Sequence, residues 1–492
     1  MRSAISITIA AGLVRIVIGG LTPLFPDETY YWEWSRRLAA GYFDHPPAIA
    51  WLIHGGTSVA GDTPLGVRLV PGITGILAGL FLCGSAHRLA GDRAALITAV
   101  VFAIMPLSAA GLILATPDAP LLAAAAATCW AVLGALEHPP RSWRSFGWWI
   151  VAGITVGLGL LSKYTAVLLP FGVFVAFLVY REWRPRLADP GPYVATVIAV
   201  AIFSPVVLWN ASHDWASFAF QLRHGLAGTG GSVINREFEL IGGQMALVSP
   251  ILFVMMIAAA RRRDLQPPTS TLLPAVAATI FVFFMYSATK RRVEANWPAL
   301  AYVPGILLLA ARARTRAWSS WLRAGIGVAA LLTLTTYVNT FTPALPVPAR
   351  RDPVARSAGW DDMGRAVNRV YEPRLSISAY RTHVGADRYQ EASQLAFQLP
   401  NHPESYALNL TTRPNQYDLW PGFEQRARPR DGLILVLDDL NGEHPTITSL
   451  RPHFTAVTRG EQVILARDGD PIKALRVWTL DGWLGSWPRK QQ

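Results

Sequence analysis

Long apolar runs alternate with short polar loops over the first two thirds of the chain. A bilayer core of about 30 Å needs roughly 20 apolar residues at 1.5 Å per residue, and about eleven runs approach this length. They cover residues 4–24, 66–88, 93–114, 119–137, 146–161, 164–181, 192–209, 243–260, 271–288, 296–311 and 321–341. The pattern predicts a polytopic α-helical membrane protein with about eleven to thirteen transmembrane helices.

The pattern changes after residue 341. From 342 to 492 the chain becomes mixed and charged, and the strand-like pieces "GLILVLDD" and "EQVILARD" lie near the helix-like "ADRYQEASQLAFQL". We therefore expect a transmembrane domain at 1–341 and a C-terminal soluble α/β domain at 342–492.

Composition agrees with a membrane protein. Of the 492 residues, 52% are hydrophobic and 15% are charged, against roughly 25% charged in a soluble domain. Cys83 and Cys129 both lie in predicted spans, so neither a disulfide framework nor a cysteine-based zinc site is supported. Arg15 interrupts the first run after Arg2, which favours an uncleaved anchor over a signal peptide.

The net charge of +12 does not indicate a nucleic-acid partner, because many arginines lie in short loops after every second run. These are Arg88, Arg93, Arg141, Arg144, Arg181, Arg184, Arg186, Arg261, Arg262, Arg263, Arg312, Arg314 and Arg316. Such loops are cytoplasmic by the positive-inside rule. The opposite loops and the C-terminal domain are then expected on the extracytoplasmic, periplasmic side of the inner membrane.

The first outward loop carries "PDETYYWEW". Asp27 and Glu28 after Pro26 fit a helix with an acidic first turn beside an aromatic belt. They equally fit a carboxylate that takes a proton from a hydroxyl at the membrane surface. Tyr30 and Tyr31 offer apolar faces to a sugar or to the first isoprenes of a lipid.

Three further outward stretches have the same two readings. Asp118 in "TPDAP" follows an ordinary helix start, but as a second outward acid it is a candidate to orient an acceptor or tune Asp27. Asp44 and His45 in "YFDHPP" fit either a turn or a binding site, in which His45 would contact a donor phosphate. Lys163 in "SKYT" fits either a snorkelling lysine or a contact with that phosphate, with Tyr164 beside it as a substrate contact.

The stretch "KRRVEANWP" disobeys the charge rule. Lys290, Arg291 and Arg292 are basic on the outward side, and an anion there, such as a lipid phosphate, would explain them. Glu294, Asn296 and Trp297 stand next to these cations, which favours a combined phosphate and sugar site over a solvated loop.

Taken together, "PDETYYWEWSRRLAAGYFDHPP", "RLVPGITGILAG", "TPDAPLL", "SKYTAVLLP", "KRRVEANWPAL" and "RPNQYDLW" resemble the bacterial protein-mannosyltransferase-like GT-C glycosyltransferases, which include the lipid A aminoarabinose transferases. The resemblance spans nearly the whole chain in the family's motif order. It implies an inverting enzyme, catalytic in its transmembrane domain, that transfers a sugar from a polyprenyl phosphate to a glycolipid, glycan or protein acceptor outside the cytoplasmic membrane.

The resemblance also assigns roles. The family's first outer acid maps onto Asp27, with Glu28 beside it, and its second onto Asp118. Where aminoarabinose transferases carry a lysine before the paired prolines and an arginine after the first acid, this chain has His45 and Tyr30. Both departures remove a cation and weaken the case for aminoarabinose as the sugar. No cofactor is required, and a divalent metal is compatible with the sequence but not indicated by it.

Two alternatives stay open. One is a protein O-mannosyltransferase, which differs in its acceptor. The other is a lipid-linked sugar flippase or transporter, which should carry ionisable residues near mid-membrane, where Arg15 is the clearest example. A binding or assembly role of the C-terminal domain is a third class, indicated only if Asp27 is dispensable.

Overall fold

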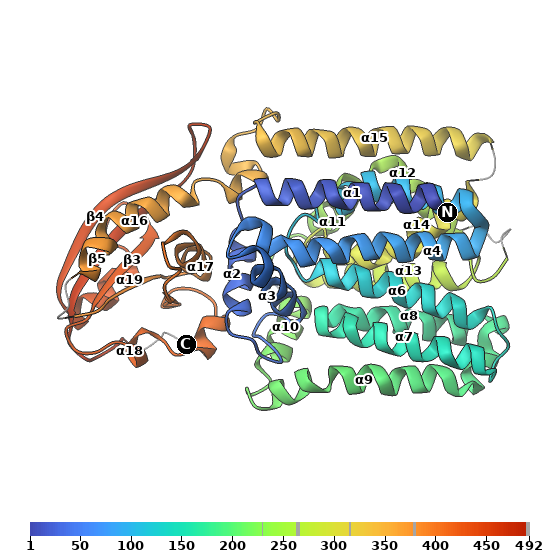
Figure 1. Ribbon diagram of the computed structural model, residues 1–492, viewed down its shortest axis with the longest axis horizontal. Coiled ribbons are helices and arrows are strands. Elements are labelled where there is room, and N and C mark those ends of the chain that lie inside the picture. Colours follow the sequence, from blue (N-terminus) through green and yellow to red (C-terminus); the bar gives the residue numbers. More distant parts are fainter. Residues whose placement is uncertain (229, 262–265, 314–315, 377–379, 489–492) are drawn as a thin grey trace. The chain divides into compact units, whose positions relative to one another are not determined.

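The computed structural model describes every residue except 229, 262–265, 314–315, 377–379 and 489–492 (Figure 1). Three of the predicted loop arginines, Arg262, Arg263 and Arg314, lie outside the described residues. The chain forms two compact units. We call residues 1–21 and 38–338 the helical unit, and residues 22–37 and 339–492 the sheet unit.

The helical unit is built from α-helices and short 3-10 helices. Its α-helices are α1 (Arg2–Leu21), α3 (Ala48–Ala60), α4 (Pro64–Ile104), α5 (Pro106–Ala109), α6 (Asp118–Leu136), α7 (Trp143–Ser162), α8 (Leu168–Val179), α9 (Pro190–Ala211), α10 (Ala216–Leu226), α11 (Val233–Val248), α12 (Pro250–Arg261), α13 (Leu272–Lys290), α14 (Tyr302–Arg312) and α15 (Arg316–Phe341). The 3-10 helices are η1 (Tyr164–Val167), η2 (Arg181–Ala188) and η3 (Trp297–Ala301).

Among the described residues, seven helices are long and apolar enough to cross a membrane, and up to nine spans result if two bent helix pairs each count as one. The chain is thus a multi-pass membrane protein, as predicted. The predicted count of eleven to thirteen is higher because of α4 and α14. Element α4 consists of two helices that meet at non-helical backbone at Ala90 and Gly91, and its second part folds back on the first, since Phe102 lies against Gly79. It thus accounts for both predicted runs, 66–88 and 93–114, whereas α14 is too short to span.

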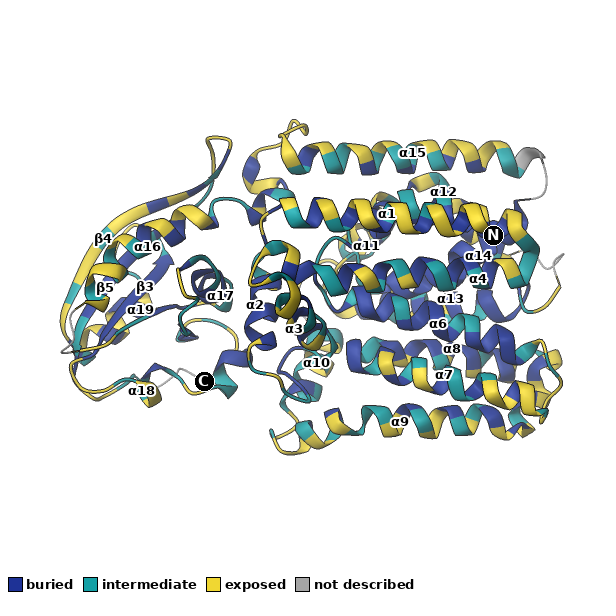
Figure 2. Cartoon of the chain, viewed as in Figure 1, coloured by how far each residue is buried: buried dark blue, intermediate teal, exposed yellow. Residues whose placement is uncertain are grey.

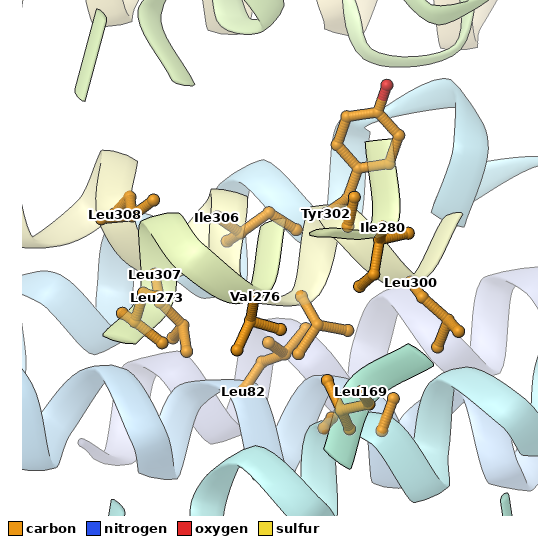
Figure 3. Close-up of a cluster of buried hydrophobic side chains, with 14 of the residues drawn as sticks. Leu82, Leu169, Leu273, Val276, Ile280, Leu300, Tyr302, Ile306, Leu307 and Leu308 are labelled. Atoms are coloured by element: carbon orange, nitrogen blue, oxygen red, sulfur yellow. The ribbon is translucent and has the colours of Figure 1, made fainter. Parts of the chain in front are cut away.

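Helix α14 lies inside the bundle. Each residue from Tyr302 to Arg312 is buried (Figure 2), because a helix that is apolar on all sides must be surrounded by other apolar groups. Figure 3 shows Ile306, Leu307 and Leu308 of this helix among leucines and valines of its neighbours. Outer helices differ: only 28% of the span of α1 or α9 is buried, against 83% for α6. Their exposed apolar faces suit lipid.

Arg15 is explained by helix capping. Its guanidinium is 3% exposed and donates hydrogen bonds to the carbonyl oxygens of Phe102 (2.9 Å) and Ala103 (3.1 Å). These carbonyls lie in the last turn of α4, where helical backbone leaves acceptors without partners. The clearest ionisable residue inside a predicted span thus has a structural role at the end of a helix.

Charged residues at the ends of the helices form two separate groups within the helical unit. At one end Arg88 pairs with Glu137 at 2.5 Å, and Arg186 pairs with Asp189 at 3.1 Å. These arginines belong to the loops predicted to be cytoplasmic. The polar residues of the predicted outward loops contact one another instead, as described below. Which group faces the cytoplasm stays a prediction.

The sheet unit contains a five-stranded mixed sheet in the order β2-β1-β3-β5-β4. Strands β1, β2 and β3 are parallel, and β5 and β4 are antiparallel. The strands are β1 (Thr382–Ala386), β2 (Ser405–Ala407), β3 (Gly432–Asp438), β4 (Phe454–Arg467) and β5 (Asp470–Trp483). The helices are α2 (Pro26–Ser35), η4 (Ala349–Arg351), η5 (Val354–Ser357), α16 (Trp360–Leu375), α17 (Tyr389–Gln398), η6 (Gln416–Leu419), α18 (Phe423–Arg426), α19 (Pro445–Leu450) and η7 (Arg451–His453).

Alternation along β3 supplies both faces of this sheet. Ile434 and Val436 join a core with α16 and α17, whereas Leu433, Leu435 and Leu437 join a second core with α18 and α19. Successive strand residues point to opposite faces, so a continuous apolar strand is covered on both sides. The predicted α/β domain is therefore a layered mixed sheet.

Helix α2 packs with the sheet unit. Gln394 of α17 donates a hydrogen bond to the carbonyl oxygen of Leu24 (2.9 Å), and the hydroxyls of Ser393 and Thr29 are 3.0 Å apart. Trp32 adds an edge contact with Phe397, at a ring-centroid distance of 5.0 Å. The compact unit thus includes residues 22–37, which the predicted division at 341/342 does not.

Candidate functional site

Helix α10 connects three of the predicted site segments in the helical unit. Its Gln221 side chain donates to the Asp44 carbonyl oxygen, its Ser217 hydroxyl is 2.7 Å from that of Tyr164, and its Arg223 carbonyl accepts from Arg291 at 3.1 Å. Rings of α10 also contact aromatic rings of the same three segments. Segments 42–47, 163–164 and 290–297 therefore meet around one short helix within the helical unit.

Asp118 is held by residues from two other segments. Lys163 Nζ donates to Asp118 Oδ1 at 2.7 Å, and Asn296 Nδ2 donates to Asp118 Oδ2 at 2.6 Å. The side chains of Asp118 and Lys163 are only 14% and 12% exposed. Because both carboxylate oxygens are engaged, Asp118 fixes the start of α6 to the end of α7 and to the loop before η3.

Tyr164 and Trp297 provide aromatic surface near this cluster. The Tyr164 ring makes an edge contact with Phe218, at a centroid distance of 5.1 Å. The Trp297 ring lies 5.3 Å from the His224 ring and 6.3 Å from that of Phe284. The side chains of Tyr164 and Trp297 are therefore half-buried. Both pack against α10, and Trp297 also packs against α13.

Asp44 and His45 lie in the turn before α3. The Asp44 side chain is 5% exposed, and the preceding Phe43 ring packs on Phe220 of α10 at 5.0 Å. The carbonyl oxygen of His45 accepts a hydrogen bond from Tyr42 at 3.2 Å. The turn is thus built into the bundle, and a role of either side chain in binding stays a prediction.

The three outward cations have different surroundings. Lys290 is exposed at the end of α13, with its ammonium 5.6 Å from the centre of the Tyr286 ring. Arg292 lies 3.4 Å from the carboxylate of Glu239, and both are well exposed. Arg291 is half-buried, and its Nε atom is buried without a hydrogen-bond partner among the described residues. Arg291 is thus the cation with unused donor capacity in a sheltered place.

Glu294 is exposed two residues after Arg292. Arg236 of α11, which sequence reasoning did not single out, donates to the carbonyl oxygens of Ala288 and Thr289, each at 2.9 Å. It thereby caps the C-terminal end of α13, where the basic loop begins.

Asp27 lies in the first turn of α2, in the sheet unit. Its carboxylate is exposed, and its Oδ1 accepts a hydrogen bond from the Tyr389 hydroxyl at 3.2 Å. Glu28 differs, because it is fully buried and its Oε2 accepts from the Phe25 main-chain N–H at 3.0 Å. Of the two adjacent acids, Asp27 faces solvent and Glu28 caps the helix.

Tyr30 and Tyr31, predicted as faces for a sugar or lipid, are buried. The Tyr30 ring lies 4.4 Å from that of Tyr389 and stacks on Tyr417 at 6.0 Å, and its hydroxyl accepts from the Gln416 N–H at 2.7 Å. Tyr31 makes an edge contact with Trp34 at 4.9 Å. Their observed contacts are packing within the sheet unit, and a substrate role stays a prediction.

Glu33 is a buried acid that sequence reasoning missed. It bonds Arg36 at 2.9 Å and Arg37 at 3.2 Å. Burial raises the pKa of the Glu33 carboxyl, and the two arginines oppose this rise. The available signal was its spacing of three and four residues from two arginines that directly follow α2.

The chain is similar in sequence and in structure to known glycosyltransferases. Residues 44–209, which include Asp118 and Lys163, match a family model described as dolichyl-phosphate-mannose-protein mannosyltransferase. The lipid A galacturonosyltransferase RgtD of Rhizobium johnstonii is 28% identical over 324 residues, which are 62% of this chain and 64% of that protein. The undecaprenyl phosphate-α-4-amino-4-deoxy-L-arabinose arabinosyl transferase of Pseudomonas aeruginosa is 28% identical over 214 residues, 40% of this chain and 39% of that protein.

The chain thus aligns with less than two thirds of the length of these relatives. A solved structure covers more. The crystal structure of ArnT from Cupriavidus metallidurans bound to undecaprenyl phosphate superposes with a TM-score of 0.65, covering 96% of this chain and 97% of that one at 19% identity. At this identity the similarity shows a shared fold. The predicted resemblance to the protein-mannosyltransferase-like GT-C glycosyltransferases is thus confirmed, with the family model matching residues 44–209.

Proposed function

We propose that this protein is an inverting glycosyltransferase of the cytoplasmic membrane, which moves a sugar from a polyprenyl-phosphate donor to a hydroxyl of lipid A or another lipopolysaccharide component. The observation that carries the proposal is the Asp118–Lys163 pair at 2.7 Å. It lies inside the matched segment 44–209, and Asn296 completes it from a distant part of the chain.

The names of the relatives support the choice of donor and acceptor. RgtD is a lipid A galacturonosyltransferase, and the Pseudomonas relative takes its sugar from an undecaprenyl phosphate. The structure that shares the fold is bound to undecaprenyl phosphate. An extracytoplasmic position of the chemistry follows from the positive-inside rule and belongs to the proposal.

In the proposed reaction the acceptor oxygen attacks the anomeric carbon from the face opposite the phosphate. The bond from that carbon to the phosphate oxygen breaks, and Asp27 takes the acceptor's proton. The exposure of this carboxylate and its bond from the Tyr389 hydroxyl support the role, because a base must be reachable and oriented. The phosphate leaves as an anion and needs no proton.

Cations stabilise the leaving phosphate electrostatically. Arg291 suits this role best, because its buried Nε has no partner among the described residues and guanidinium groups pair well with phosphate. Lys290 and Arg292 are proposed to add positive charge near the same phosphate. Lys163 is committed to Asp118, so it positions the site in place of holding the phosphate. His45, Asp44, Tyr164, Glu294 and Trp297 are proposed to shape the sugar and lipid pocket.

The protein O-mannosyltransferase alternative keeps the same donor chemistry, and the description of the matching family favours it. The acceptor separates the two. Lipids and glycans from a strain lacking the protein should lose one sugar from lipopolysaccharide by mass spectrometry, and plasmid-borne protein should restore it. Unchanged lipopolysaccharide together with lost protein glycosylation would select the alternative.

A further inference from the structure

A polar hollow lies at the carboxyl edge of the parallel strands in the sheet unit. Asp387 and Arg388 follow β1, Asp438 ends β3, Glu391 lies in the first turn of α17, and His444 precedes α19. Together with Thr411, from the loop after β2, these residues line the hollow. Each of the three parallel strands thus contributes lining residues to this hollow, from its last residue or from the segment that follows it.

The topology makes this edge a natural binding crevice. Strand β1 leads through α17 to β2 on one side, while β3 lies on its other side. Connections from neighbouring parallel strands that depart in opposite directions leave a crevice outside their carboxyl ends, where α/β proteins bind ligands. The hollow lies at this switch point.

One carboxylate in the hollow is incompletely paired. Glu391 is 4% exposed, and its Oε2 atom has no hydrogen-bond partner among the described residues. Its other oxygen pairs with Lys473, whose ammonium also lies 2.7 Å from Asp438. A buried oxygen without a donor is unfavourable, so a ligand that donates a hydrogen bond to Oε2 would gain affinity there.

Donors face the same hollow. His444 Nδ1 accepts a hydrogen bond from the Thr446 main-chain N–H at 3.2 Å, so in the neutral ring the proton lies on Nε2. Burial lowers the pKa of His444, and the carboxylates of Asp387 and Asp438 oppose this. Arg388 adds a half-exposed guanidinium, 3.4 Å from Asp438.

The charges and the size limit the ligand. Three carboxylates, of Asp387, Glu391 and Asp438, face two cations, Arg388 and Lys473, which disfavours an anion such as phosphate. No group of three His, Cys, Asp or Glu side chains in the described part of the chain has metal-binding geometry. The hollow is open to solvent and its cavity volume is about 30 Å³, so it admits one or two polar groups of a ligand and not a whole molecule. Adjacent hydroxyls at one edge of a small polar ring suit these limits.

We propose that this hollow, the carboxyl-edge site, binds a single sugar ring through adjacent hydroxyls that donate to Glu391 and accept from His444 and Arg388. A hydroxyl both donates and accepts, so carboxylates beside nitrogen donors match it. The site stands apart from the proposed transfer reaction, and neither depends on the other. The sugar comes either free or as part of a glycolipid headgroup.

The test uses the full chain in nanodiscs with methyl glycosides of glucose, galactose and mannose as probes, and saturation-transfer NMR as the readout. Glu391→Gln removes the charged acceptor. His444→Asn keeps a side-chain acceptor for the Thr446 N–H and removes the Nε2 donor. Glu461→Gln is the matched control, because Glu461 pairs with Arg369 at an exposed position.

At least one glycoside should bind wild type and the control alike, and each site variant should weaken it about ten- to a hundredfold. Competition by a soluble lipid A disaccharide would assign the ring to a glycolipid headgroup, and its absence to a free sugar. The site does not exist as proposed if no glycoside binds wild type, or if His444→Asn, with an unchanged thermal midpoint, binds as wild type does. That second variant decides the matter if Glu391→Gln fails to fold.

Discussion

Lys163 Nζ lies 2.7 Å from Asp118 Oδ1, and Asn296 occupies the other carboxylate oxygen at 2.6 Å. One side chain begins α6, one follows the end of α7 and one precedes η3, so a single carboxylate ties three segments together. Because both oxygens of Asp118 accept such bonds, we propose that this side chain positions the site. Its predicted catalytic role stays a prediction.

Asp118→Asn should lower both stability and activity. A partly buried ion pair loses about 3 to 5 kcal/mol when one partner is removed, and the remaining 12% to 14% exposure of these side chains places the loss at or below the lower figure. Lys163→Met should cost a similar amount, and the double variant much less than the sum. Thermal unfolding in detergent measures all three. Glu239→Gln, which breaks the exposed pair with Arg292, is the control and should change little. Strictly additive losses would contradict the pairing.

Arg291→Gln should weaken donor binding more than either neighbouring change. Its sheltered guanidinium has unused donor capacity, and a charge-assisted hydrogen bond contributes about 1.5 to 3 kcal/mol, or roughly ten- to a hundredfold in affinity. Titration of polyprenyl phosphate into nanodiscs checks this. Arg292→Gln should have the smallest effect, because Arg292 faces Glu239. Equal binding by all three single variants and the triple variant would move the phosphate site elsewhere.

Arg15→Leu should destabilise the helical unit without abolishing transfer at a permissive temperature. The change removes the Arg15 donor from the carbonyl of Ala103, at about 1 to 3 kcal/mol, whereas the carbonyl of Phe102 keeps its second donor, the Ser108 hydroxyl. Thermal midpoints and residual transfer rates measured on one preparation test this. A stable variant that has lost only sugar-lipid movement across vesicles would instead support the transporter reading.

Acid should weaken the sheet unit through Asp439. Hydrogen bonds from Arg476, at 2.8 and 2.9 Å, lower the pKa of Asp439 to about 2. A carboxylate with a lowered folded pKa stabilises the fold above its unfolded pKa of about 3.9, and this stabilisation is lost as pH falls through the folded value. Asp439→Asn should therefore be less stable than wild type at pH 7, and the difference should vanish between about pH 4 and pH 2. A pH-independent difference would exclude this linkage.

Individual residues show which features of the site could be predicted from the sequence. Asp118, Lys163 and Asn296 were each identified at the ends of apolar runs, and the structure brings them together. Their mutual pairing was beyond the sequence, because the partners are 45 and 178 residues apart. Arg15 shows the reverse: an arginine in a span indicates function until its acceptors at the end of α4 are seen.

The role of α10 and the interior position of α14 could not be predicted from the sequence. Hydropathy reports the length of an apolar run, so it could not tell that α14 is an interior helix. Helix α10 has the ordinary sequence "ASFAFQLRHGL", and only tertiary contacts show that it holds three site segments. The burial of Tyr30 and Tyr31 could not be predicted either, because aromatic packing leaves no distinct signal in the sequence, and their substrate role stays a prediction.

The most direct measurement of the central claim is transfer by purified protein from an undecaprenyl-phosphate sugar to lipid A, followed by mass spectrometry, for wild type and Asp27→Asn. The account predicts a transferred sugar with inverted anomeric configuration and a loss of about 10² to 10⁴ in rate for Asp27→Asn, with donor binding retained. Asp361→Asn, another exposed acid in the first turn of a helix of the sheet unit, should behave as wild type. Transfer by Asp27→Asn at the wild-type rate would contradict the account.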